Sequence, residues 1–291
     1  MPELPEVETI ARGLANRVTD DVIESVWLGS KREPLKSTAS DIVATLQDRR
    51  IAGVRRVGKH IVFDLERNGV SPVAAAKPRR SPALAGKKAV PTSAAAQWIV
   101  HLGMTGRMLV CQPEAQIEKH THAIVTLASG RELRFVDPRR FGRLSVSTGF
   151  AAAGLEPLEI PFEPFTRLFR GRKTPIKSAL LNQKLLTGVG NIYADESLFR
   201  AGVRPRRRAG SLTREDLKSL YVSLQEVLKE AIALGGSSVA DYVDADGEEG
   251  FFQLQHRVYG REGEPCLTCK TGIKRVVIAG RSSHYCPKCQ K

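Results

Sequence analysis

Four cysteines near the end of the chain have the spacing of a metal site. Cys266, Cys269, Cys286 and Cys289 form two C-x2-C pairs that are separated by sixteen residues. Four thiolates at this spacing suit a tetrahedral Zn²⁺ ion in a closed, structural site. Two redox-active pairs are the alternative explanation. The spacing favours one structural Zn²⁺ over redox chemistry.

The segment between the two cysteine pairs has the pattern of a β-hairpin. Val276–Ile278 are β-branched, and the turn residues Gly280–Ser283 follow them. This pattern puts Arg281 at the tip of the hairpin. An arginine there suits contact with a phosphate, although a solvated arginine explains the spacing equally well.

The other candidate for chemistry is the beginning of the chain, MPELPE. If Met1 is removed, Pro2 becomes an N-terminal secondary amine. An α-amino group titrates near pH ~7.7–8.0, so part of it is unprotonated at neutral pH and can attack a sugar C1′ to form an iminium. Glu3 and Glu6 are close enough to act as a general acid or as hydrogen-bond partners. The same residues also suit the ordinary start of a helix, and the chemistry alone favours that interpretation.

Composition restricts the class of protein. The 291 residues include 45 Lys and Arg against 31 Asp and Glu, which gives a net charge of +14 and a pI near 9.8. Such an excess indicates a polyanionic partner. No apolar run approaches the ~20 residues of a membrane span, so an integral membrane protein is excluded. Acidic residues stand where a signal peptide would be basic and then apolar, which predicts a cytoplasmic protein.

Periodicity supplies the elements that must position these residues. Val7, Ile10, Leu14 and Val18 fall at helical spacing and predict a first helix. Residues from about 20 to 148 alternate with period two and predict a β-sandwich. The predicted strands are Val22–Leu28, Ile61–Leu65, Trp98–Leu102, Ile124–Leu127 and Leu133–Phe135.

One segment inside the β region is different. Residues 68–96 contain four prolines, nine alanines and five basic residues but no acidic one. This composition predicts a disordered insertion. The insertion is either a flexible arm that touches nucleic acid or a solvated loop that the fold tolerates, and the second is favoured.

After about residue 150 the pattern becomes helical. Pro175 opens one segment, Asn191–Arg200 form another, and the apolar stripe within 217–228 predicts a long helix with Thr213 as its N-cap. Thr187–Asn191, TGVGN, form a glycine-containing turn between two helices. The amide groups at the start of the second helix can receive a phosphate, but any tight turn has the same pattern.

Six motifs in order resemble the formamidopyrimidine-DNA glycosylase family of DNA repair enzymes. They are MPELPEVETI, HLGMTGR at 101–107, DPRRFG at 137–142, GVGNIYADESLF at 188–199, VYGREGEPC and GRSSHYCPKCQ. The resemblance implies an α+β protein with three domains. These are an N-terminal helix and β-sandwich (1–148), a helical domain with a helix-two-turn-helix motif (149–255), and a β-hairpin zinc finger (256–291).

The resemblance also implies an activity, that of a bifunctional DNA glycosylase/AP lyase. Such an enzyme flips and excises oxidised purines, 8-oxoguanine and formamidopyrimidines, and then cleaves the strand by β,δ-elimination. Pro2 would be the nucleophile that forms a Schiff base, and Glu3 the acid that protonates the opening sugar. Lys59 would assist elimination, Arg281 would complete the catalytic set, and Glu6 would support it.

Flipping leaves a gap in the base stack that side chains must fill. The resemblance assigns this role to Met104, Arg139 and Phe141, with Arg139 as the reader of the orphan base. It assigns backbone contacts to His120, Arg140, Lys173 and Asn191. It places Lys177 and Glu196 near the damaged-base pocket, which a loop over residues 237–252 would close.

The predicted partner is damaged double-stranded DNA, bound by a monomer. Two alternatives remain. An endonuclease VIII-like glycosylase would remove oxidised pyrimidines, but such relatives usually begin PEGPE rather than PELPE. A noncatalytic zinc-ribbon DNA-binding protein would explain the charge and the finger, but not the presence of Pro2, Glu3 and Lys59 together.

Overall fold

The computed structural model describes residues 1–68, 96–238 and 243–291. The predicted disorder of the insertion therefore concerns residues that lie almost wholly outside the described part. Its predicted boundary was one residue too long, because Ala96 is buried and begins a strand. None of the helices in the described ranges has the length and apolar character of a membrane-spanning segment.

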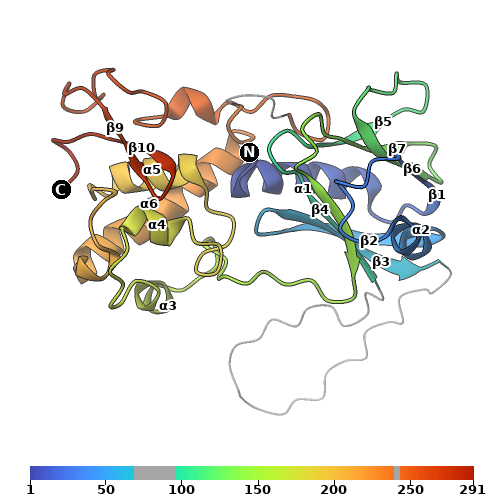
Figure 1. Cartoon of the computed structure of the whole chain (residues 1–291), viewed down its shortest axis with the longest axis horizontal. Coiled ribbons are helices and arrows are strands. Elements are labelled where there is room, and N and C mark those ends of the chain that lie inside the picture. Colours follow the sequence, from blue (N-terminus) through green and yellow to red (C-terminus); the bar gives the residue numbers. More distant parts are fainter. Residues whose placement is uncertain (69–95, 239–242) are drawn as a thin grey trace, which may run out of the picture.

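The chain begins with helix α1, Leu4–Val18, as predicted. The helix starts with a capping box. The Glu3 side chain accepts a hydrogen bond from the backbone amide of Glu6, and the Glu6 side chain accepts one from the backbone amide of Glu3. The apolar stripe of α1 is buried against the β region. Figure 1 shows the N-terminus at the waist between a β-rich half and a helical half.

The β region forms two antiparallel four-stranded sheets, which confirms the predicted sandwich. One sheet has the order β1-β6-β7-β5, with β1 Ile23–Leu28, β5 Arg107–Cys111, β6 Thr121–Leu127 and β7 Glu132–Val136. The other has the order β2-β3-β4-β8, with β2 Arg49–Val57, β3 His60–Arg67, β4 Ala96–His101 and β8 Arg143–Ser147. Large side chains such as Trp98, Phe63 and Phe135 fill the shared core.

Four elements of this half were missed by the sequence analysis. Strands β2, β5 and β8 carry arginines and half-buried positions, so they lack a clean alternation. Helix α2, Ala39–Leu46, has only eight residues, and its buried face consists of Ile42 and Leu46. The side chain of its N-cap, Thr38, accepts a hydrogen bond from the Asp41 amide at 3.1 Å.

The second half is helical, as predicted. It contains α3 Phe162–Arg167, α4 Ile176–Leu180, α5 Asn191–Arg200, α6 Arg214–Ala233 and the short 3-10 helices η1 Ala209–Ser211 and η2 Phe252–Gln255. Thr213 caps α6 through the amide of Asp216, as expected. The TGVGN turn joins α4 to α5, with Gly188 at φ +88°. This turn points the N-terminus of α5 at the waist of the molecule.

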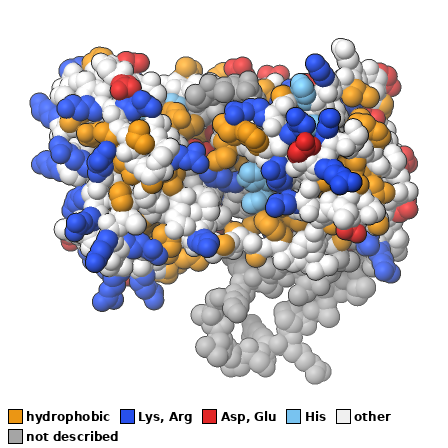
Figure 2. Space-filling model, viewed as in Figure 1, with side chains coloured by type: hydrophobic (Ala, Val, Ile, Leu, Met, Phe, Trp, Pro, Cys, Tyr) orange, Lys and Arg blue, Asp and Glu red, His pale blue; other side chains and the backbone are white. Residues whose placement is uncertain are grey.

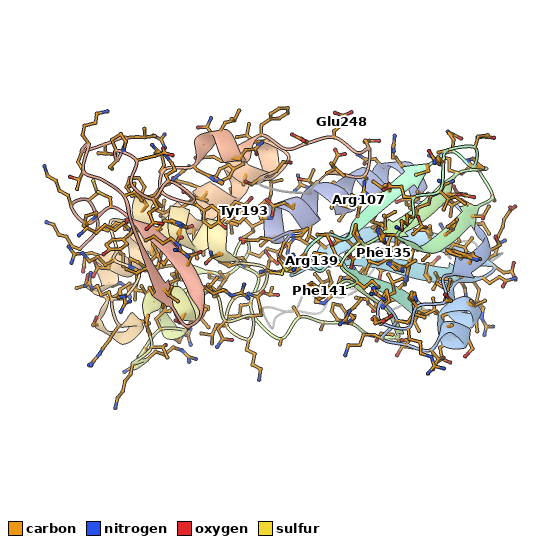
Figure 3. All side chains as sticks on the ribbon, turned by 45° about the horizontal axis from the view of Figure 1, so that its top comes forward. Arg107, Phe135, Arg139, Phe141, Tyr193 and Glu248 are labelled. Carbon is orange, nitrogen blue, oxygen red and sulfur yellow. The ribbon has the colours of Figure 1, made fainter. Side chains whose placement is uncertain are left out.

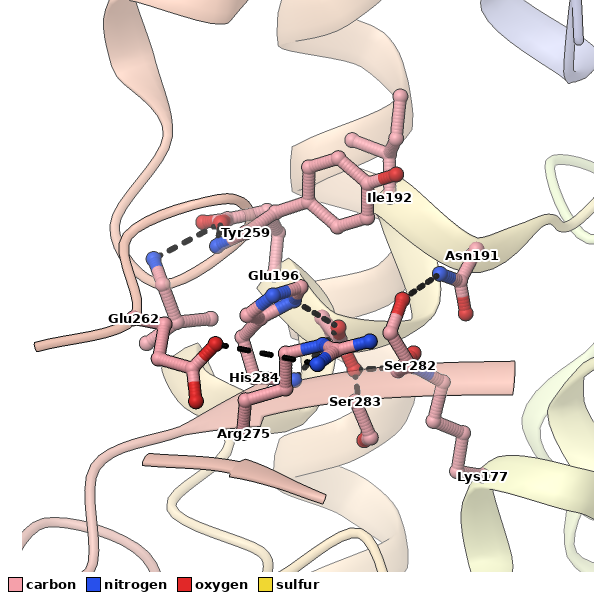
Figure 4. Close-up of polar contacts among 12 residues, drawn as sticks. Lys177, Asn191, Ile192, Glu196, Tyr259, Glu262, Arg275, Ser282, Ser283 and His284 are labelled. Carbon is pink, nitrogen blue, oxygen red and sulfur yellow. Dashed lines mark hydrogen bonds and ion pairs between the residues drawn. The ribbon is translucent and has the colours of Figure 1, made fainter. Parts of the chain in front are cut away.

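The hairpin of β9, Lys274–Ile278, and β10, Arg281–Tyr285, packs on α5. A buried carboxylate fixes the hairpin there. Asp195 of α5 accepts hydrogen bonds from the Ser283 hydroxyl at 3.0 Å and from the His284 amide at 2.9 Å. Lys177 of α4 donates to Asp195 at 2.6 Å and to the Ser282 carbonyl at 2.7 Å (Figure 4). The hairpin is therefore held rigidly next to α4 and α5.

The described residues contain three hydrophobic clusters, over the sandwich, the helical half and the finger. These clusters are compatible with domains at 1–148, 149–255 and 256–291, and we retain those boundaries as a proposal. Four residues cross them: Leu4 and Tyr259 pack in the helical cluster, Ala245 packs in the sandwich cluster, and Phe199 packs against the finger cluster. The two halves are thus packed into each other at the N-terminus.

Candidate functional site

A cleft of about 1040 Å³ lies where the sandwich, the helical half and the hairpin meet. Seven of the predicted site residues line it: Pro2, Glu3, Glu6, Lys59, Met104, Asn191 and Arg281. They come from the N-terminus, two sandwich loops, the start of α5 and the hairpin. The fold thus collects residues that are up to 279 positions apart in the chain.

The N-terminus is fixed against the TGVGN turn. The Leu4 amide donates to the Gly188 carbonyl at 3.0 Å, and Pro2 is buried at the cleft. Met1 is attached to Pro2 and is 48% exposed. Removal of Met1 would leave the Pro2 nitrogen as a free amine in this cleft.

The Glu3 carboxylate lies against the N-terminus of α5. Its Oε1 accepts the Ile192 amide at 3.2 Å, whereas its Oε2 is buried without a partner in the protein. Burial raises the pKa of Glu3 to about 7, although the charge of Lys59 opposes the shift. A carboxyl group with this pKa is suited to general acid catalysis near neutral pH.

Glu6 is the more firmly held carboxylate. Its Oε1 accepts the Ser237 amide at 2.8 Å and the hydroxyl of Tyr193, and its Oε2 accepts the Glu3 amide at 2.8 Å. Burial raises the pKa of Glu6, and these hydrogen bonds oppose the shift. Because its oxygens are occupied by fixed donors, Glu6 is a positioning group.

Lys59 lies in the turn between β2 and β3, directly after Gly58 at φ +61°. Burial lowers its pKa, while the charges of Glu3 and Glu6 oppose that shift. The buried Arg56 fixes this turn by donating to Gly58 O at 3.2 Å, to Glu8 at 2.8 Å and to Glu156 at 2.9 Å. Sequence analysis missed Arg56, because nothing distinguishes it from the other basic residues of β2.

The three predicted gap-filling residues come from two neighbouring loops. Met104 is 43% exposed and Phe141 is 48% exposed, which is unusual for side chains of this size. The Arg139 guanidinium lies 4.9 Å from the centre of the Phe141 ring. Figure 3 shows Arg139 and Phe141 together at the end of the sandwich that faces the helical half.

Asp137 joins these two loops, and sequence analysis did not single it out. It is fully buried and accepts the Thr105 hydroxyl at 2.6 Å, the Gly142 amide at 2.7 Å and the Arg139 amide at 3.2 Å. An aspartate directly after a buried strand and before a tight loop is the signal that could have revealed it.

Five predicted DNA contacts lie outside the residues that line the cleft: Arg139 and Phe141 on the sandwich loop, and His120, Lys173 and Arg140. His120 and Lys173 are exposed on loops. Arg140 has φ +56°, and its guanidinium lies 3.2 Å from Glu33. Their contacts with DNA remain a proposal.

The placement of Lys177 and Glu196 does not support the expected role in a lesion pocket. Neither lines the cleft, and both are fully buried. Lys177 pairs with Asp195, while Glu196 accepts the amides of 257–259 at 2.8–2.9 Å. Their charges are satisfied inside the protein, so both residues hold the hairpin and its preceding segment on α5.

Asn191 and Arg281 meet at the rim of the cleft near the hairpin. The Asn191 Nδ2 atom is 3.4 Å from the hydroxyl of Ser282, and its Oδ1 is buried without a protein partner. Arg281 is exposed, and its charge helps to lower the pKa of Lys59. This rim presents positive charge and free polar atoms to the cleft.

His101, at the end of β4, also lines the cleft. Its ring lies against the His60 ring, tilted by 53° with the ring centres 4.9 Å apart, and its Nδ1 accepts a hydrogen bond from the Gly103 amide at 3.1 Å. Burial lowers the pKa of His101 to about 4, so the ring is neutral at neutral pH. A neutral ring beside Lys59 adds no repulsion to the cleft.

The four predicted zinc ligands converge in space. The sulfur atoms of Cys266, Cys269, Cys286 and Cys289 all lie within 4.8 Å of one another. Two of the pairs are 3.4 and 3.9 Å apart. Tetrahedral Zn²⁺ with Zn–S bonds of about 2.3 Å requires sulfur separations of about 3.8 Å, so the cluster fits a zinc ion.

Three family models match consecutive parts of the chain. "Formamidopyrimidine-DNA glycosylase N-terminal domain" matches residues 1–144, "Formamidopyrimidine-DNA glycosylase H2TH domain" matches 153–243, and "Zinc finger found in FPG and IleRS" matches 263–291. The chain belongs to the formamidopyrimidine-DNA glycosylase family. This family consists of DNA repair glycosylases, so the predicted family and enzyme class are confirmed.

Relatives in this family match the chain over its full length. The chain is 44% identical to a formamidopyrimidine-DNA glycosylase from Solibacter usitatus, with both chains covered completely. The crystal structure of the MutM (Fpg) protein from Thermus thermophilus matches with a TM-score of 0.81 and 39% identity, over 99% of this chain and 98% of that one. The Lactococcus lactis Fpg bound to DNA with an N7-benzyl-Fapy-dG matches with a TM-score of 0.83 and 29% identity, over all of both chains.

A substitution at Gly190 tests the close packing of the Glu3 carboxylate against the start of α5. A Cβ atom at Gly190 would lie 2.0 Å from the Glu3 Cδ atom, so Gly190→Ala should destabilise the fold by about 1–3 kcal/mol through overcrowding. Glu3→Ala should relieve the clash in the double variant. Urea unfolding measures both, and Gly149→Ala is the control because it has open space. Purely additive single effects would contradict the contact.

The raised pKa of Glu3 predicts a pH-dependent stability. Its usual value is 4.5, so between about pH 4.5 and 7 the unfolded chain releases this proton while the folded chain keeps it. The contribution of Glu3 to stability is therefore complete below pH 4.5 and is lost as the pH rises to 7.

Glu3→Gln should remove this loss. The free energy of unfolding of the variant should rise relative to the original by roughly 3 kcal/mol from pH 4.5 to 7. Denaturant unfolding across this range measures the difference, and Glu24→Gln at an exposed position is the control. A difference that does not change with pH would refute the shifted pKa.

Proposed function

We propose that the chain is a bifunctional DNA glycosylase/AP lyase that excises oxidised purines, 8-oxoguanine and formamidopyrimidines, from duplex DNA. One observation carries the proposal: Pro2, Glu3 and Lys59 line one cleft, with Arg281 and Asn191 at its rim. An amine, a protonated acid and cations around one space suit attack at a sugar carbon next to phosphates. The names and DNA complexes of the relatives support the substrate class.

The mechanism begins with the amine of Pro2 after removal of Met1. Its nitrogen attacks C1′, the bond from C1′ to the damaged base breaks, and the base leaves with the proton that the Pro2 nitrogen loses. Glu3, whose pKa of about 7 keeps much of it protonated, gives its proton to the sugar ring oxygen as the ring opens. The product is an iminium between Pro2 and C1′.

Strand cleavage follows from that iminium, which makes the C2′ proton acidic. Loss of this proton expels the 3′ phosphate, and a second elimination expels the 5′ phosphate. Lys59 and Arg281 stabilise the departing phosphates, and the lowered pKa of Lys59 also suits it to move protons. Glu6 holds the backbone of Glu3 in place throughout.

The partner is damaged double-stranded DNA, bound by a monomer in the cytoplasm. Met104 and Phe141 fill the gap left by the flipped nucleotide, and Arg139 reads the orphan base. His120, Arg140, Lys173 and Asn191 hold the backbone. One Zn²⁺ in the cysteine cluster stabilises the finger and so keeps Arg281 at the cleft.

Borohydride trapping tests the nucleophile. Reduction should crosslink the chain to duplexes that carry oxidised purines, and peptide mapping should find the adduct on Pro2. A chain whose N-terminus is blocked by an extension should not be trapped. An adduct on Lys59, or normal trapping of the blocked chain, would overturn this role, and preferential trapping on oxidised pyrimidines would favour the endonuclease VIII-like alternative.

Opposite-base preference tests Arg139. Arg139→Ala removes the reader of the orphan base, so discrimination between cytosine and adenine opposite 8-oxoguanine should weaken by roughly 1–3 kcal/mol. Excision rates on the two duplexes measure the effect. Arg140→Ala is the matched neighbour, and it should leave the preference unchanged because its guanidinium pairs with Glu33. An unchanged preference in the Arg139 variant would reduce that residue to a phosphate contact.

A further inference from the structure

Exposed cations continue from the cleft onto the helical half. They lie on the loop between α3 and α4 and on the loop between α5 and η1. We call this set the arginine strip; it consists of Arg170, Arg172, Lys173, Arg206 and Arg208, all of which are exposed. Figure 2 shows that Lys and Arg side chains gather along this outer part of the helical half.

Backbone hydrogen bonds hold the two loops side by side. Ile176 N donates to Arg207 O at 2.8 Å, Ala209 N to Thr174 O at 2.9 Å, and Gly210 N to Arg172 O at 2.8 Å. The cations of the strip are therefore mounted on a fixed platform. A platform of this kind loses little conformational freedom when it binds.

The charge of the strip is not neutralised within the protein. The nearby carboxylates Asp216 and Glu163 already pair with Arg207 and Arg214, which do not belong to the strip. Within the described ranges, no residue of the strip forms an ion pair. Five positive charges thus face solvent together.

The strip begins at the rim of the cleft. Arg206 donates to the carbonyl of Val277 at 3.2 Å, and Val277 lines the cleft. On the other loop, Lys173 stands five residues before Ser178, which also lines the cleft. A polyanion that leaves the cleft on this side would therefore pass over the strip.

We propose that the arginine strip binds the phosphates of double-helical DNA on one flank of the cleft, several base pairs from the flipped nucleotide. This inference rests on the proposed function for its substrate. Neither loop exposes a large apolar or aromatic side chain on which unpaired bases could stack, so the strip suits a duplex backbone rather than a single strand. Phosphate contacts carry no sequence information, so the strip serves undamaged and damaged DNA equally.

The test measures binding of undamaged duplexes of roughly 10 and roughly 30 base pairs at several salt concentrations. Arg170→Ser/Arg208→Ser removes two charges and leaves the Arg206 contact with the hairpin intact. Arg32→Ser/Lys229→Ser is the control, because it removes two exposed charges outside the strip. Single-turnover excision at saturating protein reports the chemistry separately.

The strip variant should bind the long duplex roughly tenfold more weakly, with a slope of log affinity against log salt that is flatter by about 1.8. Binding of the short duplex and excision should match those of the control. An equal loss in the control variant, an equal loss on the short duplex, or a greater loss on single strands would overturn the proposal. If the unsubstituted chain fails to excise damaged bases, the proposed function is wrong. The binding of undamaged duplexes still tests the strip in that case.

Discussion

The hydrogen bonds at the Glu6 carboxylate are the constraint on which the site depends. This buried group joins the amide of Glu3, the hydroxyl of Tyr193 and the amide of Ser237, which belong to three distant parts of the chain. A buried carboxylate is costly unless donors surround it, so each donor is held in place by the cost of losing it. The position of the N-terminal residues follows from this arrangement.

Burial then sets the chemistry of the groups around Glu6. Removal from water favours the neutral forms, so it raises the pKa of Glu3 and lowers the pKa of Lys59. Their mutual attraction opposes both shifts without cancelling them. One physical cause therefore yields a carboxyl group that can donate a proton near neutral pH and, in the same cleft, an amine with a lowered pKa.

The sequence predicted the helix stripes, the sandwich and the cysteine cluster, because each depends on periodicity or spacing along the chain. Residue chemistry made Pro2 and Glu3 candidates, and only the family motifs selected them and added Lys59. The sequence did not predict the roles of Asp137 and Arg56, because these roles depend on contacts between remote loops. The full burial of Lys177 and Glu196 was not foreseen, because a charge in a motif does not reveal whether it faces a ligand or the interior.

Leu4 has a consequence for how the protein forms. It packs in the helical cluster, and its amide bonds to Gly188, so the first turn of the chain is completed only after most of the sequence has been made. Closure of so long a loop makes this a late event in folding. A nascent or partly folded chain thus has no assembled cleft, and the Glu3 carboxylate reaches the N-terminus of α5 only when both halves are joined. The buried environment of Glu3 is in this way a property of the finished molecule.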